Sequence, residues 1–198
     1  MLLAMRIEGI GERLRGLGGV VDRHERGDPE FPEAAITWLR ACEQLLLGLR
    51  IREGAELATL RGAIVKAGER LVDDDSGTSR RTAARRARAV AAADSLERAN
   101  TLLQQIAAEA ESRLRHFEAK LTEAMTAAVL VGLVEPPPDE PRERWLARVW
   151  QRLAAHQATR PTTVYLAAAL HAPDRLYLLD RVLARLAEPD LGVLAPGG

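Results

Sequence analysis

The feature that most constrains the fold is residues 80–134, which contain no proline and no glycine before Gly132. The stretch is rich in Ala, Leu, Glu, Gln and Arg, the residues with the highest helix propensity. Apolar or small residues recur along it in steps of three and four, so one face of a helix stays apolar: Leu96, Ala99, Leu103, Ile106, Ala110, Leu114, Phe117, Leu121, Met125 and Ala128. The pattern predicts one helix about 80 Å long, around which other helices must pack.

Two further helices are expected before this stretch. Apolar residues from Leu3 to Val21 recur in steps of four and three, although several glycines interrupt them. These glycines either allow close backbone approach or break the helix near Gly18 and Gly19. A second helix is predicted from Glu33 towards Val72, with a kink at Gly54, and it should pack antiparallel to the long helix.

The long helix itself has one position at which it can be interrupted. Asp94 and Glu97 have the spacing of a capping box, in which each side chain satisfies a free backbone N–H group at a helix start. A new helix beginning at Asp94 is therefore the alternative to a continuous one.

The clearest boundary is the proline-rich segment 135–141, since consecutive prolines cannot continue a helix. Three shorter helices are predicted beyond it, at about 141–157, 162–171 and 173–188. We therefore predict an all-α fold: an elongated helical hairpin or bundle built on one long helix in residues 1–134, a linker at 135–141, and a small C-terminal three-helix region at 142–198.

Composition argues against several classes of partner and compartment. The 28 basic residues balance the 28 acidic ones, so the chain as a whole offers no electrostatic attraction to nucleic acid or anionic lipid. Cys42 is the single cysteine and lies in register with Trp38, Leu45 and Leu49, which indicates a buried, inert thiol. With no secretion signal and no apolar run long enough for a membrane span, we expect a soluble, cytoplasmic protein.

The strongest local charge anomaly is an arginine cluster at residues 80–88, at the start of the long helix. Cationic side chains there oppose the helix dipole. Arg81, Arg85 and Arg88 fall within one arc of the helix and could contact a phosphate backbone. The alternative is neutralisation by Asp73–Asp75 or by the acidic face of a partner. No aromatic residue lies among these arginines, so stacking on bases is not supported.

Large apolar side chains suggest a second kind of contact. Trp145 and Trp150 lie on one short helix, where core packing is the default and an exposed pair would anchor a partner. Leu130 and Leu133 lie in an end of the long helix that is apolar on all sides, so other helices or another subunit must cover it. These four residues are the candidate partner interface.

No pattern for catalysis or for a cofactor is present. The histidines lie far apart in the sequence, no Glu-x-x-His pair or H-E-x-x-H occurs, and neither a nucleophile elbow nor a Walker A loop is found. We therefore predict no catalytic, cofactor or metal site and no small-molecule substrate.

The leading hypothesis is a non-enzymatic helical scaffold or adaptor that acts through helix–helix contacts with a protein partner or itself. The alternative is a helical nucleic-acid-binding subunit of a ribonucleoprotein or DNA-binding assembly that uses the arginine cluster. A protein lying on a membrane surface is disfavoured, because the apolar faces lack flanking lysine-rich stripes.

Overall fold

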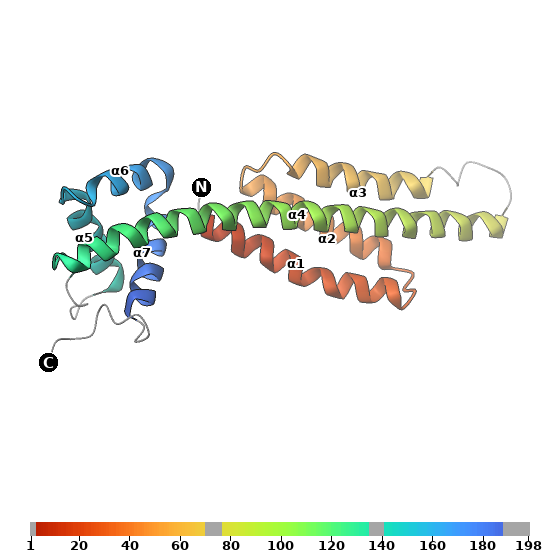
Figure 1. Cartoon of the computed structure of the whole chain (residues 1–198). Coiled ribbons are helices and arrows are strands. Elements are labelled where there is room, and N and C mark those ends of the chain that lie inside the picture. Colours follow the sequence, from red (N-terminus) through yellow and green to blue (C-terminus); the bar gives the residue numbers. More distant parts are fainter. Residues whose placement is uncertain (1–2, 70–76, 135–140, 188–198) are drawn as a thin grey trace. The chain divides into compact units, whose positions relative to one another are not determined.

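The computed structural model describes residues 3–69, 77–134 and 141–187. Within these ranges the chain forms seven α-helices and no strand, which confirms the predicted all-α class (Figure 1). The helices are α1 (Leu3–Glu25), α2 (Phe31–Gly48), α3 (Gly54–Glu69), α4 (Gly77–Leu130), α5 (Arg142–Ala155), α6 (Arg160–Ala169) and α7 (Ala172–Ala187). The predicted long helix is α4, and it is continuous through Asp94, so the alternative start at that residue is not used.

Contacts within the chain divide it into two compact units. The four-helix unit comprises Arg6–Glu109, and the C-terminal unit comprises Met1–Met5 together with Ala110–Gly198. Helix α4 contributes its first part to the four-helix unit and its last part to the C-terminal unit. The predicted linker at 135–141 falls almost entirely outside the described residues, and the domain division based on it stays a prediction.

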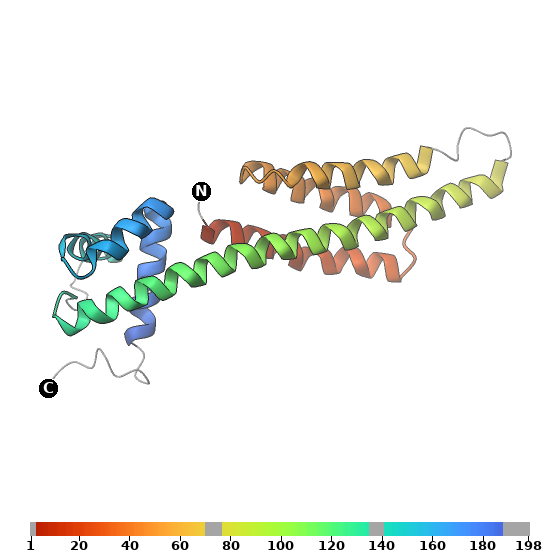
Figure 2. The same cartoon turned by 45° about the horizontal axis from the view of Figure 1, so that its top comes forward.

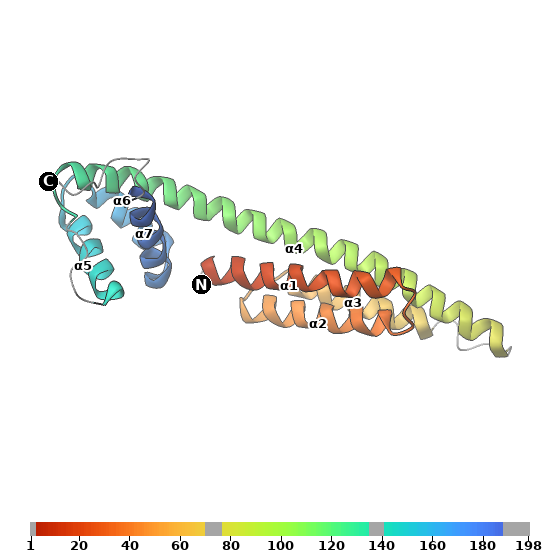
Figure 3. The same cartoon turned by 90° about the horizontal axis from the view of Figure 1, so that it is seen from below.

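In the four-helix unit, each helix runs antiparallel to the one before it (Figures 1 and 3). Their apolar faces meet in one core, to which α1 contributes Ile10, α2 contributes Leu39, α3 contributes Ile64 and α4 contributes Leu103. Sparse polar contacts supplement this core. Trp38 donates its indole N–H to the carbonyl oxygen of Arg13 at 2.9 Å, and the buried Ser95 hydroxyl donates to the carbonyl oxygen of Leu60 at 3.3 Å.

The apolar stripe of α4 is buried over its whole predicted length. All ten residues are buried: Leu96, Ala99, Leu103, Ile106, Ala110, Leu114, Phe117, Leu121, Met125 and Ala128. Burying a Leu, Ile, Met or Phe side chain contributes roughly 1.5–3 kcal/mol, so this one face supplies a large part of the driving force for packing. The periodicity predicted the stripe correctly.

The predicted second helix is wrong in one respect, because two helices replace the kinked one. Helix α2 ends at Gly48 and α3 begins at Gly54. Arg50 takes a left-handed backbone conformation (φ 53°), and the N–H groups of Arg50 and Ile51 donate to the carbonyl oxygens of Leu47 (2.9 Å) and Leu46 (2.8 Å). This pair of bonds is a Schellman motif, which satisfies the free carbonyl groups at the end of a helix. The chain therefore reverses here and does not merely bend.

The glycines of α1 do not break the helix, which continues through Gly18 and Gly19. A Cβ atom built at Gly9 would lie 3.1 Å from Cδ1 of Leu45, whereas one built at Gly18 would meet nothing within 4 Å. Close approach of two helices therefore accounts for Gly9, and Gly18 has no packing reason to be glycine.

In the C-terminal unit, α5, α6 and α7 gather around the last part of α4 (Figure 2). Its apolar interior includes Phe117 and Leu121 of α4, Leu170 directly after α6, and buried residues of the three short helices: Trp145, Leu146, Val149, Leu153, Leu166, Leu178, Leu179, Val182, Leu183 and Leu186. The predicted short helices are confirmed to within a few residues at their ends.

Two buried carboxylates form ion pairs or hydrogen bonds within the C-terminal unit. The Glu118 side chain of α4 is 5% exposed and pairs with Arg181 of α7 at 3.3 Å and with Arg185 of α7. The buried Asp174 side chain accepts a hydrogen bond from the backbone N–H of Ala4 at 3.5 Å, so a residue of α7 caps the first turn of α1. A carboxylate at a helix start also complements the helix dipole.

Replacing Arg50 with glycine should stabilise the protein. The left-handed conformation costs a residue with a Cβ atom roughly 1–2 kcal/mol, and glycine removes this cost. Part of the resulting stabilisation is lost because glycine also makes the unfolded chain more flexible. We expect Arg50→Gly to raise the free energy of unfolding in urea by about 0.5–1 kcal/mol. Arg52→Gly, in the same turn, is the control and should give no gain. Equal effects of the two substitutions would contradict the assignment of the motif.

Alanine substitutions in α1 should distinguish Gly9, which lies close to Leu45, from Gly18, which has open space beside it. Gly18→Ala should raise the free energy of unfolding by about 0.5–1 kcal/mol, because alanine is the better helix former and its methyl group meets open space. Gly9→Ala should gain less or lose stability, because Leu45 must move to make room. Urea unfolding followed by circular dichroism measures both, and a larger gain at Gly9 would contradict the packing described.

Candidate functional site

The predicted arginine cluster does not behave as one set. Arg88 forms an ion pair with Glu33 of α2 (Nη2 to Oε1, 2.9 Å), so its charge is already compensated within the four-helix unit. In contrast, the exposed side chains of Arg81, Arg85 and Arg86 form no ion pair or hydrogen bond among the described residues. The expected neutralisation by Asp73–Asp75 concerns residues outside the described ranges.

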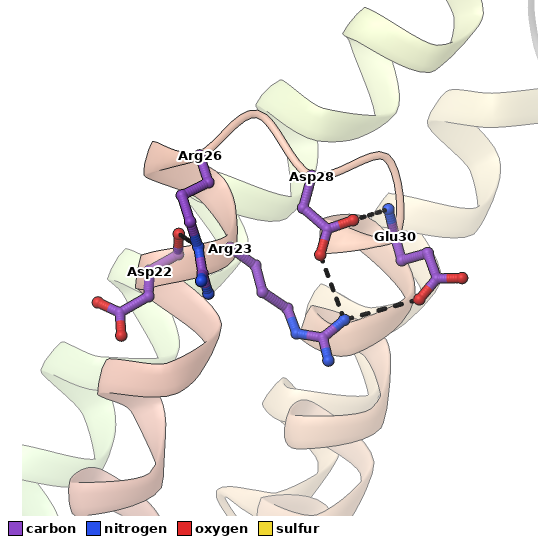
Figure 4. Close-up of polar contacts among 5 residues, drawn as sticks. All are labelled: Asp22, Arg23, Arg26, Asp28 and Glu30. Atoms are coloured by element: carbon purple, nitrogen blue, oxygen red, sulfur yellow. Dashed lines mark hydrogen bonds and ion pairs between the residues drawn. The ribbon is translucent and has the colours of Figure 1, made fainter.

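The turn between α1 and α2 lies close to two of these free arginines and is held by its own polar contacts (Figure 4). The Asp28 carboxylate accepts a hydrogen bond from the backbone N–H of Glu30 at 2.9 Å. Arg23 reaches from α1 to the carboxylates of Asp28 (3.4 Å) and Glu30 (3.7 Å), and Arg26 donates to the carbonyl oxygen of Asp22 at 3.1 Å. The carboxylates of Asp28 and Glu30 are therefore already paired with Arg23.

Two neighbouring cavities lie between α1 and α4 in the four-helix unit, and together we call them the α1/α4 groove. The apolar part, about 200 Å³, is lined by Leu17, Val21, His24, Phe31, Ala93, Leu96, Glu97 and Asn100. The basic part, about 370 Å³, lies at the α1–α2 turn and is lined by His24, Gly27, Asp28, Pro29, Phe31, Pro32, Thr82, Arg85, Arg86 and Ala89. The two parts share His24 and Phe31, whose ring centroids lie 4.5 Å apart.

Two of the four residues predicted to contact a partner are the tryptophans of α5, Trp145 and Trp150. Trp145 is 4% exposed and Trp150 is half-buried, with the guanidinium groups of Arg142 and Arg175 lying 4.7 Å and 5.2 Å from the respective ring centroids. Trp145 is therefore a core residue, the default interpretation of the sequence, and it is not available as an exposed anchor.

At the end of α4, the predicted apolar surface is only partly covered. Leu133 is half-buried, whereas Leu130 is 78% exposed and its neighbour Val131 is 59% exposed. The helix ends in a second Schellman motif, in which Gly132 (φ 70°) donates to the carbonyl oxygen of Val129 at 3.0 Å. Leu130 and Val131 together are called the α4 tip below.

Reactive side chains are dispersed in the structure. Within the described ranges, no group of three or more His, Cys, Asp or Glu side chains could hold a metal ion. Cys42 is buried, and desolvation raises the pKa of its thiol to about 12, with a small opposing effect of Arg13. His116 contacts the Tyr165 hydroxyl through Nε2 at 3.3 Å, a surface contact between α4 and α6. None of these arrangements pairs a nucleophile with a base.

No protein-family model, curated protein or solved structure matches the chain. In the part of the chain that the structure describes, no helix is long and apolar enough to cross a bilayer.

Sequence reasoning missed the α1/α4 groove and the role of Arg86. The groove joins Val21 and Ala93, which are far apart in the chain, so no local pattern could reveal it. Arg86 belongs to the predicted cluster but lies outside the arc of Arg81, Arg85 and Arg88. Only the position of the α1–α2 turn shows that Arg85 and Arg86 face one cavity.

The thiol of Cys42 should be protected in the folded protein. A pKa near 12 leaves about a thousand-fold less thiolate at pH 8 than an ordinary cysteine has, and the sulfur is also buried. Iodoacetamide should therefore modify Cys42 at least about a thousand-fold more slowly in the folded protein than in urea. Rapid modification under native conditions, followed by mass spectrometry, would contradict the inert role.

Proposed function

We propose that this protein is a cytoplasmic, non-enzymatic helical scaffold or adaptor subunit that acts through helix–helix contacts with a protein partner or with a second copy of itself. The observation that carries the proposal is the α4 tip. Two adjacent large aliphatic side chains are exposed there, although every residue of the α4 stripe up to Ala128 is buried.

The position of the α4 tip favours a contact with another helix. Leu130 and Val131 lie two and three residues beyond the buried Ala128, at the C-terminal end of the helix that lines the interior of the C-terminal unit. Clustered apolar side chains at the surface are typical of sites that bind another protein, whereas single ones are common on any surface. Covering both side chains would contribute roughly 3 kcal/mol or more.

The dispersion of reactive groups also supports a role in binding. Cys42 is protonated and buried, and His116 contacts a tyrosine hydroxyl at the surface. A scaffold needs rigid elements and accessible surface, and both units offer helices that pack through extensive apolar cores.

Charge at the α4 tip should abolish the proposed contact. Leu130→Glu combined with Val131→Glu should reduce the sedimentation mass of the purified protein to that of one chain, or release the partner that co-purifies with it. The fold should be retained, because both side chains are exposed. Leu47→Glu, at an exposed leucine of the four-helix unit, is the matched control and should change neither property.

A wild-type protein that sediments as one chain and retains no partner from its native cell would overturn the proposal. So would a double variant that self-associates or binds its partner as well as the wild type, because the α4 tip would then have no role.

Nucleic-acid binding remains the second candidate, because Arg81 and Arg85 are exposed and form no ion pair among the described residues. With Arg88 paired to Glu33, few cations remain for phosphate contacts. Two or three contacts would give a weak salt dependence, with a slope of about −2 to −3 in a plot of log affinity against log salt concentration. Duplex or single-stranded oligonucleotides that bind the wild type but not an Arg81→Glu, Arg85→Glu variant would favour this candidate.

A further inference from the structure

The α1/α4 groove combines an apolar surface with two arginines that form no ion pair among the described residues. In its apolar part, Leu17 and Val21 of α1 face Ala93 and Leu96 of α4, and Val21 is 39% exposed. In its basic part, Arg85 and Arg86 line a cavity next to the α1–α2 turn. Apolar side chains of a ligand can enter the first part while anionic groups reach the second.

The positive charge of the basic part is not compensated by the groove itself. Asp28 is the acidic residue that lines this part, and its carboxylate already binds Arg23 and the backbone N–H of Glu30. Arg85 and Arg86 form no ion pair among the described residues, whereas Arg61, Arg88 and Arg98 of the same unit pair with Glu43, Glu33 and Glu56. A ligand that places carboxylates here would supply the missing counter-charges.

The dimensions of the groove suit a helix. From Arg85 to Asn100, α4 lines the groove over about 22 Å at the rise of an α-helix, which is about four helical turns. A helix laid in such a groove inserts apolar side chains from one face, at positions spaced three and four residues apart.

We propose that the α1/α4 groove binds an acidic amphipathic helix of a partner protein, with its apolar side chains in the apolar part and its carboxylates at Arg85 and Arg86. This inference rests on the proposed function, since it names the chemistry of a partner, but it concerns a different surface from the α4 tip.

A nucleic acid fits the groove less well. The apolar part is lined by leucine, valine and alanine side chains, which can neither donate hydrogen bonds to phosphate groups nor neutralise their charge. Phe31, the aromatic residue that lines both parts, is buried and already packs on His24, so it presents no open face to a base. The acidic residue Glu97 also lines the apolar part and would repel phosphates there.

The test begins with selection from a display library of random peptides of about 16 residues, long enough for four helical turns, on the full-length chain. The most enriched peptides are synthesised with a fluorescent label, and their dissociation constants are measured by polarisation. We expect the enriched peptides to carry Asp or Glu together with apolar residues spaced three and four apart.

Arg85→Glu combined with Arg86→Glu should weaken binding of these peptides at least about ten-fold, because attraction becomes repulsion at exposed positions. Val21→Glu should weaken it by a similar factor. Arg113→Glu combined with Arg115→Glu is the matched control: it reverses two exposed arginines of α4 in the C-terminal unit and should change binding less than about two-fold. Circular dichroism of each variant verifies that it is folded.

Three results would overturn the inference: no enriched peptide, enriched peptides without acidic residues, or peptide affinity that Arg85→Glu and Arg86→Glu leave unchanged. Oligonucleotides that displace the peptides and bind more tightly would also overturn it, in favour of nucleic acid. These results differ from failure of the proposed function. Peptide affinity that Arg85→Glu and Arg86→Glu leave unchanged would remove the groove proposal while the contact at the α4 tip stands, whereas loss of the α4 tip contact would leave peptide binding intact.

Discussion

The structure depends on one apolar stripe along α4, because the same helix face supplies a wall to two separate cores. Leu96, Leu103 and Ile106 pack in the four-helix unit, and Leu114, Leu121 and Met125 are buried in the C-terminal unit. The three- and four-residue spacing keeps these side chains on one face over many turns. Neither α1–α3 nor α5–α7 can complete a core without α4, so folding of both units is tied to one helix.

The α4 stripe was predictable because its cause is local, and this also holds for the two short helices whose first turns contain Pro161 and Pro173. The helix end at Gly48 was not predictable, since the left-handed position of its capping motif holds Arg50, where glycine is the usual signal. The candidate sites were less predictable still. Arg88 pairs with Glu33 of α2, and the buried Glu118 pairs with Arg181 and Arg185 of α7, so both pairings join helices that are far apart in the sequence.

Surface properties, more than reactive groups, suggest how the molecule acts. Arg23, Arg61 and Arg88 are each paired with a carboxylate, whereas Arg85 and Arg86, which line the basic part of the α1/α4 groove, form no ion pair among the described residues. At the α4 tip, two adjacent aliphatic side chains, Leu130 and Val131, are exposed. The proposed scaffold function is argued from the α4 tip and the proposed acidic helix from the α1/α4 groove, so variants of the two surfaces test the two contacts separately.

Hydrogen–deuterium exchange of two core variants tests most directly whether one helix completes two cores. Leu103→Ala and Leu121→Ala each remove a fully buried side chain of α4, at a cost of roughly 2–5 kcal/mol. If α4 completes both cores, Leu103→Ala should speed amide exchange in α2 and α3, and Leu121→Ala should speed amide exchange in α5–α7. Unchanged exchange in those helices, or loss of protection confined to α4 itself, would contradict the claim that they are held in place by its stripe.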